Sequence, residues 1–162
     1  QTIYEDRTEE IDGAASEDSF TMLSVTGPIV AFDHSWYGEG GAHPSYGIRR
    51  KTVDITAPGM DVNLIGLFDR RALRDALVAH PALSQQFGDV PPAEVEDVIA
   101  ALDGGCEMDL GKALTKEFSI GAMTDTTVAV QLGVSHGCEV ARGMFTTLDL
   151  VLPRPTSGYF AP

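Results

Sequence analysis

A glycine-rich stretch between two β-rich segments constrains the fold more than any other feature of the sequence. Residues 36–44 (Trp-Tyr-Gly-Glu-Gly-Gly-Ala-His-Pro) separate a segment at 29–35 from another at 46–55. β-Branched and aromatic residues on both sides of a glycine cluster are typical of a β-hairpin with a wide loop. Glycine reaches backbone angles that a Cβ forbids, so we expect a positive φ at Gly40 or Gly41. The sequence therefore predicts a hairpin over about residues 29–55.

The first strand of this hairpin has a more apolar and a more polar side. Side chains on a strand alternate between its two faces. The two resulting sets are Val30, Phe32, His34 and Trp36 on one face, and Ala31, Asp33, Ser35 and Tyr37 on the other. Because the first set is bulkier and more apolar, we expect it to face the hydrophobic core.

The middle of the chain carries helix signals. After a short strand expected at residues 60–64, Asp69 can cap a helix from Arg70 to about Ala79, which His80-Pro81 should end. A second helix is expected to start at Pro91-Pro92 and to end at Gly104-Gly105. Its apolar residues recur at helical spacing, which indicates a buried side.

Strands are predicted on both sides of the helices, at residues 20–26, 117–123, 127–132 and 145–152. This order indicates an α+β fold, a mostly antiparallel sheet with two or three helices packed on one face. We treat residues 1–162 as a single domain. Its acidic lead, residues 1–18, is expected to form an exposed strand and a mobile loop at 13–16.

The chain is strongly acidic, with 24 Asp and Glu against 11 Lys and Arg and a formal charge of −13. This balance argues against a nucleic-acid partner, because phosphates attract basic residues. No apolar run reaches the roughly 20 residues of a membrane-spanning helix, so we expect no membrane insertion. The acidity either keeps the surface solvated or selects a cationic partner.

The two cysteines, Cys106 and Cys138, each stand beside glycine and polar residues. An even count in polar surroundings predicts a disulfide between them and an oxidising compartment. The alternative is a pair of free thiols in a cytosolic protein.

Motifs for catalysis, metals or cofactors are absent from the sequence. Of its four histidines, three lie near predicted strand ends, without a spacing typical of zinc ligands. These are His34, His43 and His136. The chain also lacks the G-x-S-x-G elbow of a nucleophilic serine and a phosphate-binding glycine loop. We therefore expect no catalytic residue, no metal and no cofactor.

The hairpin loop contains side chains that a turn alone does not require, namely an aromatic pair, an acid and a histidine. Aromatic residues around it form a binding lip or cover the sheet edge, and both roles stay open. For His43 we favour a hydrogen-bonding role within the hairpin backbone over contact with a partner. The candidate binding residues are Trp36, Tyr37, Glu39, His43 and Tyr46.

Residues 37–44 resemble the Y-T-G-G-A-H hairpin of a bacterial domain of unknown function. That domain forms the extracytoplasmic part of lysozyme-sensing anti-sigma factors and also occurs in cell-wall deacetylases. The segments at 53–68 and 138–153 are similar to its next and closing segments, so the resemblance covers about residues 28–153. Arg142-Gly143 stand where the family has a proline-tyrosine-alanine-glycine loop.

The resemblance and the charge together imply a periplasmic or secreted binding or sensor module. Its partner would be a cationic protein such as lysozyme, or a cell-wall component. The alternative is a cell-envelope hydrolase acting on glycan or peptide, motivated by Glu39 and His43 in the loop. A third hypothesis is a structural or signalling domain without a ligand of its own. The sequence leaves the oligomeric state open.

Overall fold

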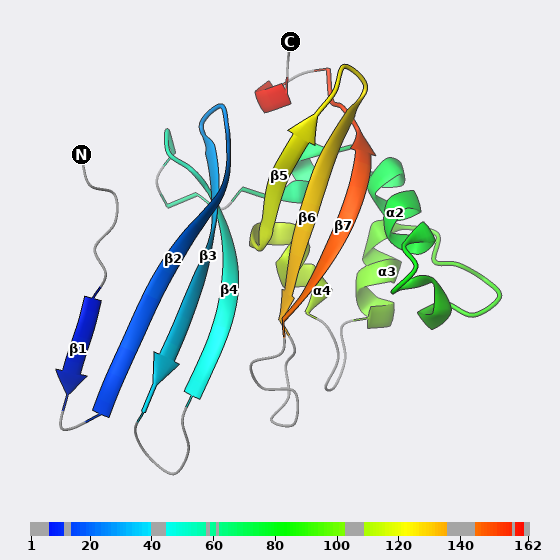
Figure 1. Cartoon of the computed structure of the whole chain (residues 1–162). Helices are drawn as coiled ribbons and strands as arrows, with labels where there is room; N and C mark the ends of the chain where they lie inside the picture. The colour runs from blue at the N-terminus through cyan, green and yellow to red at the C-terminus, as the bar shows by residue number, and fades with distance from the viewer. Residues whose placement is uncertain are drawn as a thin grey trace.

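Two antiparallel sheets and a group of short helices make up the fold (Figure 1). The computed structural model describes residues 7–11, 14–39, 45–57, 59–60, 62–102, 109–135, 145–156 and 158–160. The first sheet has the order β1-β2-β3-β4 and the second β5-β6-β7. The α+β class predicted from the sequence is confirmed, with two sheets in place of one.

The predicted hairpin forms one end of the first sheet, with β4 as its edge strand. Its strands are β3 (Ile29–Gly38) and β4 (Ser45–Asp54), which pair from Ile29 opposite Asp54 to Gly38 opposite Ser45. The loop residues 40–44, including the glycines expected to have positive φ, lie outside the described residues.

The acidic lead extends this sheet. Strand β1 (Arg7–Ile11) pairs with β2 (Ala14–Thr26), which in turn pairs with β3. A strand is therefore present in the lead, as expected. The expected loop is shorter, because Ala14 already belongs to β2. A turn at Gly27, with φ of 56°, joins β2 to β3.

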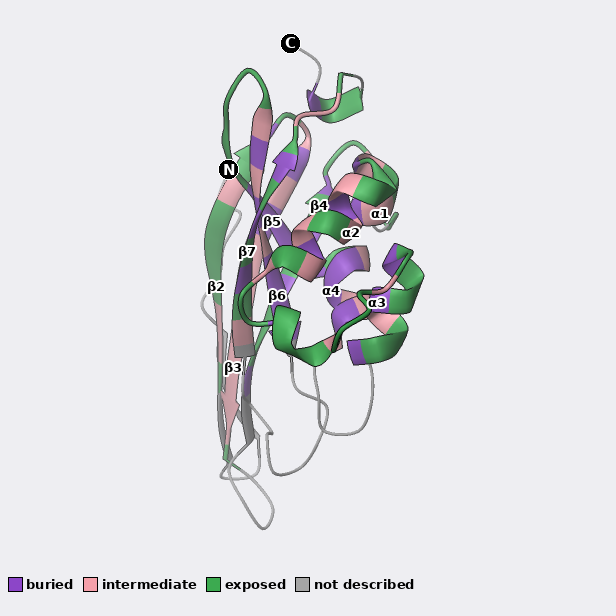
Figure 2. Ribbon diagram, turned by 90° about the vertical axis from the view of Figure 1, so that its right-hand side faces the viewer, coloured by how far each residue is buried: buried purple, intermediate pink, exposed green. Residues whose placement is uncertain are grey.

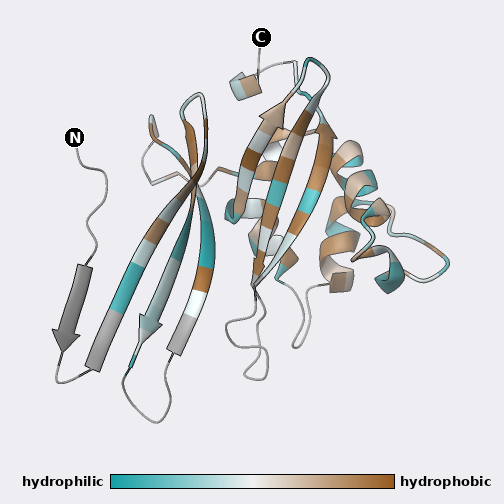
Figure 3. Cartoon of the chain, viewed as in Figure 1, coloured by the Kyte–Doolittle hydropathy of each residue, from teal (hydrophilic) through white to brown (hydrophobic). Residues whose placement is uncertain are grey.

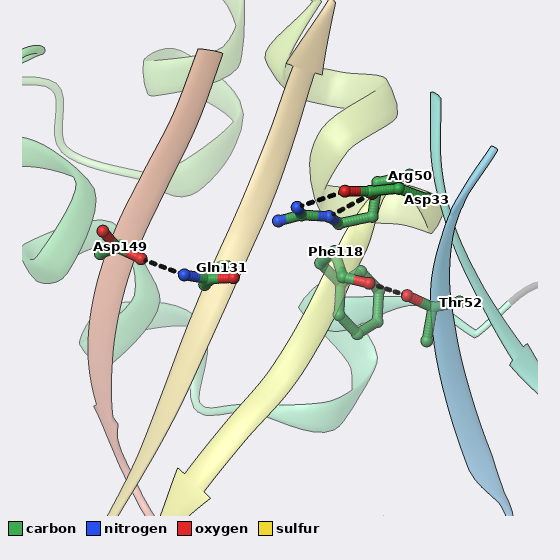
Figure 4. A network of polar contacts seen from close by, with 6 residues as sticks. All are labelled: Asp33, Arg50, Thr52, Phe118, Gln131 and Asp149. Carbon is green, nitrogen blue, oxygen red and sulfur yellow. Dashed lines mark hydrogen bonds and ion pairs between the residues drawn. The ribbon is translucent and has the colours of Figure 1, made fainter. Parts of the chain in front are cut away.

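The second sheet follows the helices. It consists of β5 (Phe118–Met123), β6 (Thr127–Ser135) and β7 (Phe145–Pro153), close to the predicted bounds. Its first strand, β5, also contacts β2, β3 and β4. At this junction the Thr52 hydroxyl donates a hydrogen bond to the carbonyl of Phe118, which ties the two sheets together (Figure 4).

The helices lie on one side of the sheets (Figure 2). They are α1 (Leu64–Leu67), α2 (Arg70–Ala79), α3 (Val95–Leu102) and α4 (Leu110–Lys116), with short 3₁₀ helices at Ser84–Gln86 and Gly158–Phe160. Their buried leucines and valines pack against the inward side chains of β6 and β7 to form the core.

The helices predicted from the sequence agree with the structure in part. Helix α2 has the predicted bounds, and the Asp69 carboxylate accepts a hydrogen bond from the Ala72 amide as its cap. Helix α3 begins at Val95, later than the prolines indicated. The strand expected at 60–64 is wrong, because Asn63 caps α1 there. Helix α4 was not predicted.

The prediction of the buried face of β3 is wrong. Ile29 and Ala31 are fully buried, whereas none of Val30, Phe32, His34 and Trp36 is. The opposite face is buried because β5 and α4 pack against that side of the hairpin. Thr52, which pairs with Ala31, makes its contact with Phe118 from this side. The apolar set of β3 therefore points away from the core.

Candidate binding surface

The predicted loop residues do not gather into one site among the described residues. Trp36 and Tyr37 are neighbours on β3 and point to opposite faces of the sheet. The Tyr37 hydroxyl donates a hydrogen bond of 2.6 Å to Glu39 Oε1, and this bond raises the pKa of Tyr37. Tyr46 pairs with Tyr37 on β4, but its side chain lies outside the described residues, as does His43.

Trp36 instead shares a face of the first sheet with apolar and aromatic residues of β2, β3 and β4, on the side turned away from the helices (Figure 2). Apolar and polar positions both occur along these strands (Figure 3). The strand register places the apolar and aromatic residues on one face, and several are large side chains with high exposure. Phe20 is 43% exposed, and Met22 and Val25 are 59% exposed. We call this surface the aromatic face; it comprises Phe20, Met22, Val25, Val30, Phe32, His34, Trp36 and Val53.

Rings form a continuous row along this face. Phe20 stacks on His34 with centroids 4.5 Å apart and planes 6° from parallel. Phe32 lies 5.8 Å from Phe20 on one side, and Trp36 lies 5.7 Å from His34 on the other. The guanidinium of Arg49 sits 5.8 Å from the Trp36 ring, within cation–π distance. Adjacent strands therefore present one row of neighbouring rings, in which Phe20 and His34 are stacked and the other two pairs are tilted.

The row is fixed by polar and steric contacts. His34 Nε2 lies 2.7 Å from Asp18 Oδ1, so the carboxylate on β2 holds the imidazole ring in place. Gly47 lies opposite Trp36 on β4, and a Cβ at this position would overlap the indole. The absence of a side chain at Gly47 is what lets the Trp36 ring lie over β4.

The aromatic face offers apolar and aromatic contacts to a binding partner. Its described residues do not form a recognisable group of catalytic side chains. Asp18 and His34 form a pair, and within the described ranges no three His, Cys, Asp or Glu side chains converge as metal ligands. His80 ends α2, where its Nδ1 accepts a hydrogen bond from the Ala82 amide. The hydrolase alternative rested on Glu39 and His43, and because His43 lies outside the described residues it stays a prediction.

Sequence reasoning missed Phe20 and Met22 as members of the site. The signal was present, since their alternation on β2 matches that of Phe32 and His34 on β3. Recognising it required the pairing register of the two strands.

Other predictions lie beyond the described residues. Cys106, Cys138 and His136 are not described, so the disulfide and the oxidising compartment stay predictions. No helix in the described ranges combines the length and the apolar character needed to cross a bilayer. Comparisons of the chain with protein-family models, curated proteins and solved structures find no match. The family resemblance therefore also stays a prediction, and function has to be argued from the surface itself.

Proposed function

We propose that this chain is a periplasmic or secreted binding module that holds a cationic protein, such as lysozyme, against the aromatic face. The observation that carries the proposal is the row of neighbouring rings on the side of the first sheet turned away from the helices. The location rests on the resemblance of residues 37–44 and on the cysteine pair.

Exposed apolar surface of this kind has a cost in water that an interface removes. Clusters of exposed rings on soluble proteins mark interaction sites, and aromatic side chains are frequent anchors of binding energy. Here the rings are already ordered by stacking and by the contact between His34 and Asp18. Binding therefore loses little side-chain entropy, which favours a tight complex.

Charge selects the class of partner. A net charge of −13 attracts a cationic protein over distances of about one Debye length and repels acidic ones. The aromatic face itself is bordered by Arg49 and Lys51 of β4, so the attraction comes from the molecule as a whole. We infer that charge accelerates the encounter and that the rings supply the contact energy.

The test uses lysozyme as the probe, with cytochrome c as a second cationic protein. Phe20→Ser and Met22→Ser remove contacts of the aromatic face, so each should weaken lysozyme binding by about tenfold or more. Met22→Ser should do so at an unchanged melting temperature, whereas Phe20→Ser also removes the ring stacked on His34 and should melt lower. The matched control is Val151→Ser, which changes a valine that is 67% exposed on the second sheet. Affinity should fall as salt rises.

Three outcomes would overturn the proposal. They are no measurable binding of lysozyme at low salt, equal losses in Phe20→Ser and Val151→Ser, and sedimentation with cell-wall glycan in place of protein binding. Equal affinity for cytochrome c and lysozyme, both lost in Met22→Ser, would support a general preference for cationic proteins.

A further inference from the structure

A cleft of about 350 Å³ lies at the free edge of β4, between this strand and α4. Its charged lining residues come from two separate parts of the chain. They are Arg49, Arg50, Lys51, Lys112, Lys116 and Glu117. The volume is at the lower end of the range for small-molecule sites.

The cleft is a positive region in a negative protein. It contains five basic side chains, although the whole chain has only 11 Lys and Arg and a charge of −13. Like charges this close repel one another, and such an arrangement is unfavourable unless anions offset it. Acidic side chains of the protein do so only in part.

Two carboxylates pair with some of these basic groups. Arg50 is 4% exposed and donates two hydrogen bonds, of 2.9 and 3.0 Å, to the oxygens of Asp33 (Figure 4). Glu117 is 1% exposed and forms ion pairs with Lys112 Nζ at 3.0 Å and Arg49 Nε at 3.4 Å. Glu117 lines the cleft together with the cations, whereas Asp33 is not among its lining residues.

Glu117 also explains how the cleft is built. It follows α4 directly, and its carbonyl accepts a hydrogen bond from the Gly133 amide, which fixes it to the second sheet. From there its carboxylate draws Lys112 from α4 and Arg49 from β4 towards each other. Lys116 and Lys51 form no ion pair with any described residue, so their ammonium groups remain available.

We propose that this cleft binds a small polyanion bearing phosphate or carboxylate groups. Two acids set against five bases leave an excess of positive charge that suits a ligand with two or more negative charges. The Arg49 guanidinium can present paired N–H donors to an oxyanion, while the lysines act as point charges. This site adjoins the partner surface proposed above, since Arg49 and Lys51 line the cleft and also border the aromatic face.

The experiment measures binding of pyrophosphate and citrate to the intact chain by isothermal titration calorimetry at constant ionic strength. Lys51→Gln and Lys116→Gln each should weaken binding about three- to tenfold, as expected for loss of one contact to a charged group. Arg71→Gln is the matched control, because it removes a positive charge from an exposed position on α2. It should leave affinity within about twofold, and all variants should melt at the wild-type temperature.

Comparing pyrophosphate with citrate distinguishes a preference for phosphate groups from a preference for carboxylate groups. Binding of pyrophosphate alone assigns the site to phosphates, binding of citrate alone to carboxylates, and binding of both to polyanions in general. No heat with either probe overturns the proposal. Equal losses in Lys116→Gln and Arg71→Gln overturn it too, as does binding of a long polymer such as heparin without binding of either small anion.

Discussion

Replacing Asp33 by alanine should destabilise the protein strongly, because it removes the partner of a buried cation. Arg50 is 4% exposed and donates two hydrogen bonds, of 2.9 and 3.0 Å, to the two carboxylate oxygens of Asp33. Removing one member of a buried ion pair typically costs about 3–5 kcal/mol, because a charge remains in a poorly solvated place.

For Asp33→Ala we expect a loss of stability somewhat smaller than this typical value. The Asp33 side chain is 22% exposed, so water can approach the vacated position and solvate part of the guanidinium. We therefore expect Asp33→Ala to lower the free energy of unfolding by about 2–4 kcal/mol. Adding Arg50→Met should recover much of this loss, because the second change removes the buried cation that has lost its Asp33 carboxylate and keeps an apolar stem of similar length.

Urea unfolding followed by far-ultraviolet circular dichroism measures both changes. Asp149→Ala is a suitable control, since its carboxylate also accepts a side-chain hydrogen bond, of 2.8 Å from Gln131, but on an exposed face (Figure 4). That control should change stability by less than about 1 kcal/mol. A loss below about 1 kcal/mol for Asp33→Ala, or a double variant as unstable as the single one, would refute the reasoning.

Three further predictions concern other parts of the chain. Gly47→Ala should displace the indole beside it, lower stability by about 1–2 kcal/mol in urea unfolding and weaken lysozyme binding; unchanged tryptophan fluorescence would contradict this. Hydrogen bonds from the Thr56 side chain and from Tyr159 lower the pKa of Asp54. The ionised Asp54 carboxylate therefore stabilises the fold fully above the ordinary carboxyl pKa, and this stabilisation is lost as pH falls through the lowered pKa. The melting temperature of Tyr159→Phe should consequently change less with pH in the acidic range than that of the unchanged protein. Thiol titration of the denatured, non-reduced protein should find the two cysteines unreactive, and two reactive thiols would refute the disulfide.

Much of the fold follows from local signals. Helix α2 was predictable from Asp69 at its start and His80-Pro81 at its end, because caps and prolines act through the nearest backbone groups. The β3–β4 hairpin was predictable because a local signal, a glycine cluster between two β-rich segments, marks it. Helix α4 was not, since it has only seven residues and depends on tertiary packing of its leucines rather than on length.

The basic cleft could not be predicted from the sequence. Its residues come from 49–53 and 112–117, and no local pattern joins these segments. Lys112 and Lys116 are four residues apart, which places them on one side of a helix once that helix is known. Their approach to Arg49 depends on the packing of α4 against β4, a property of the whole fold.

The error over β3 has a physical cause that bears on function. Periodicity shows which side chains share a face, but burial of that face depends on which elements pack against it. In this chain β5 and α4 cover the side that carries Arg50, so that side buries a cation paired with the partly exposed Asp33, while the other side carries rings. A sheet that buries a cation and leaves large apolar side chains such as Phe20 and Met22 exposed departs from the usual pattern of stability, and such departures are expected where a surface serves binding. The failed prediction thus supports the proposal already drawn from the ring geometry, that the aromatic set on β3 belongs to an interface.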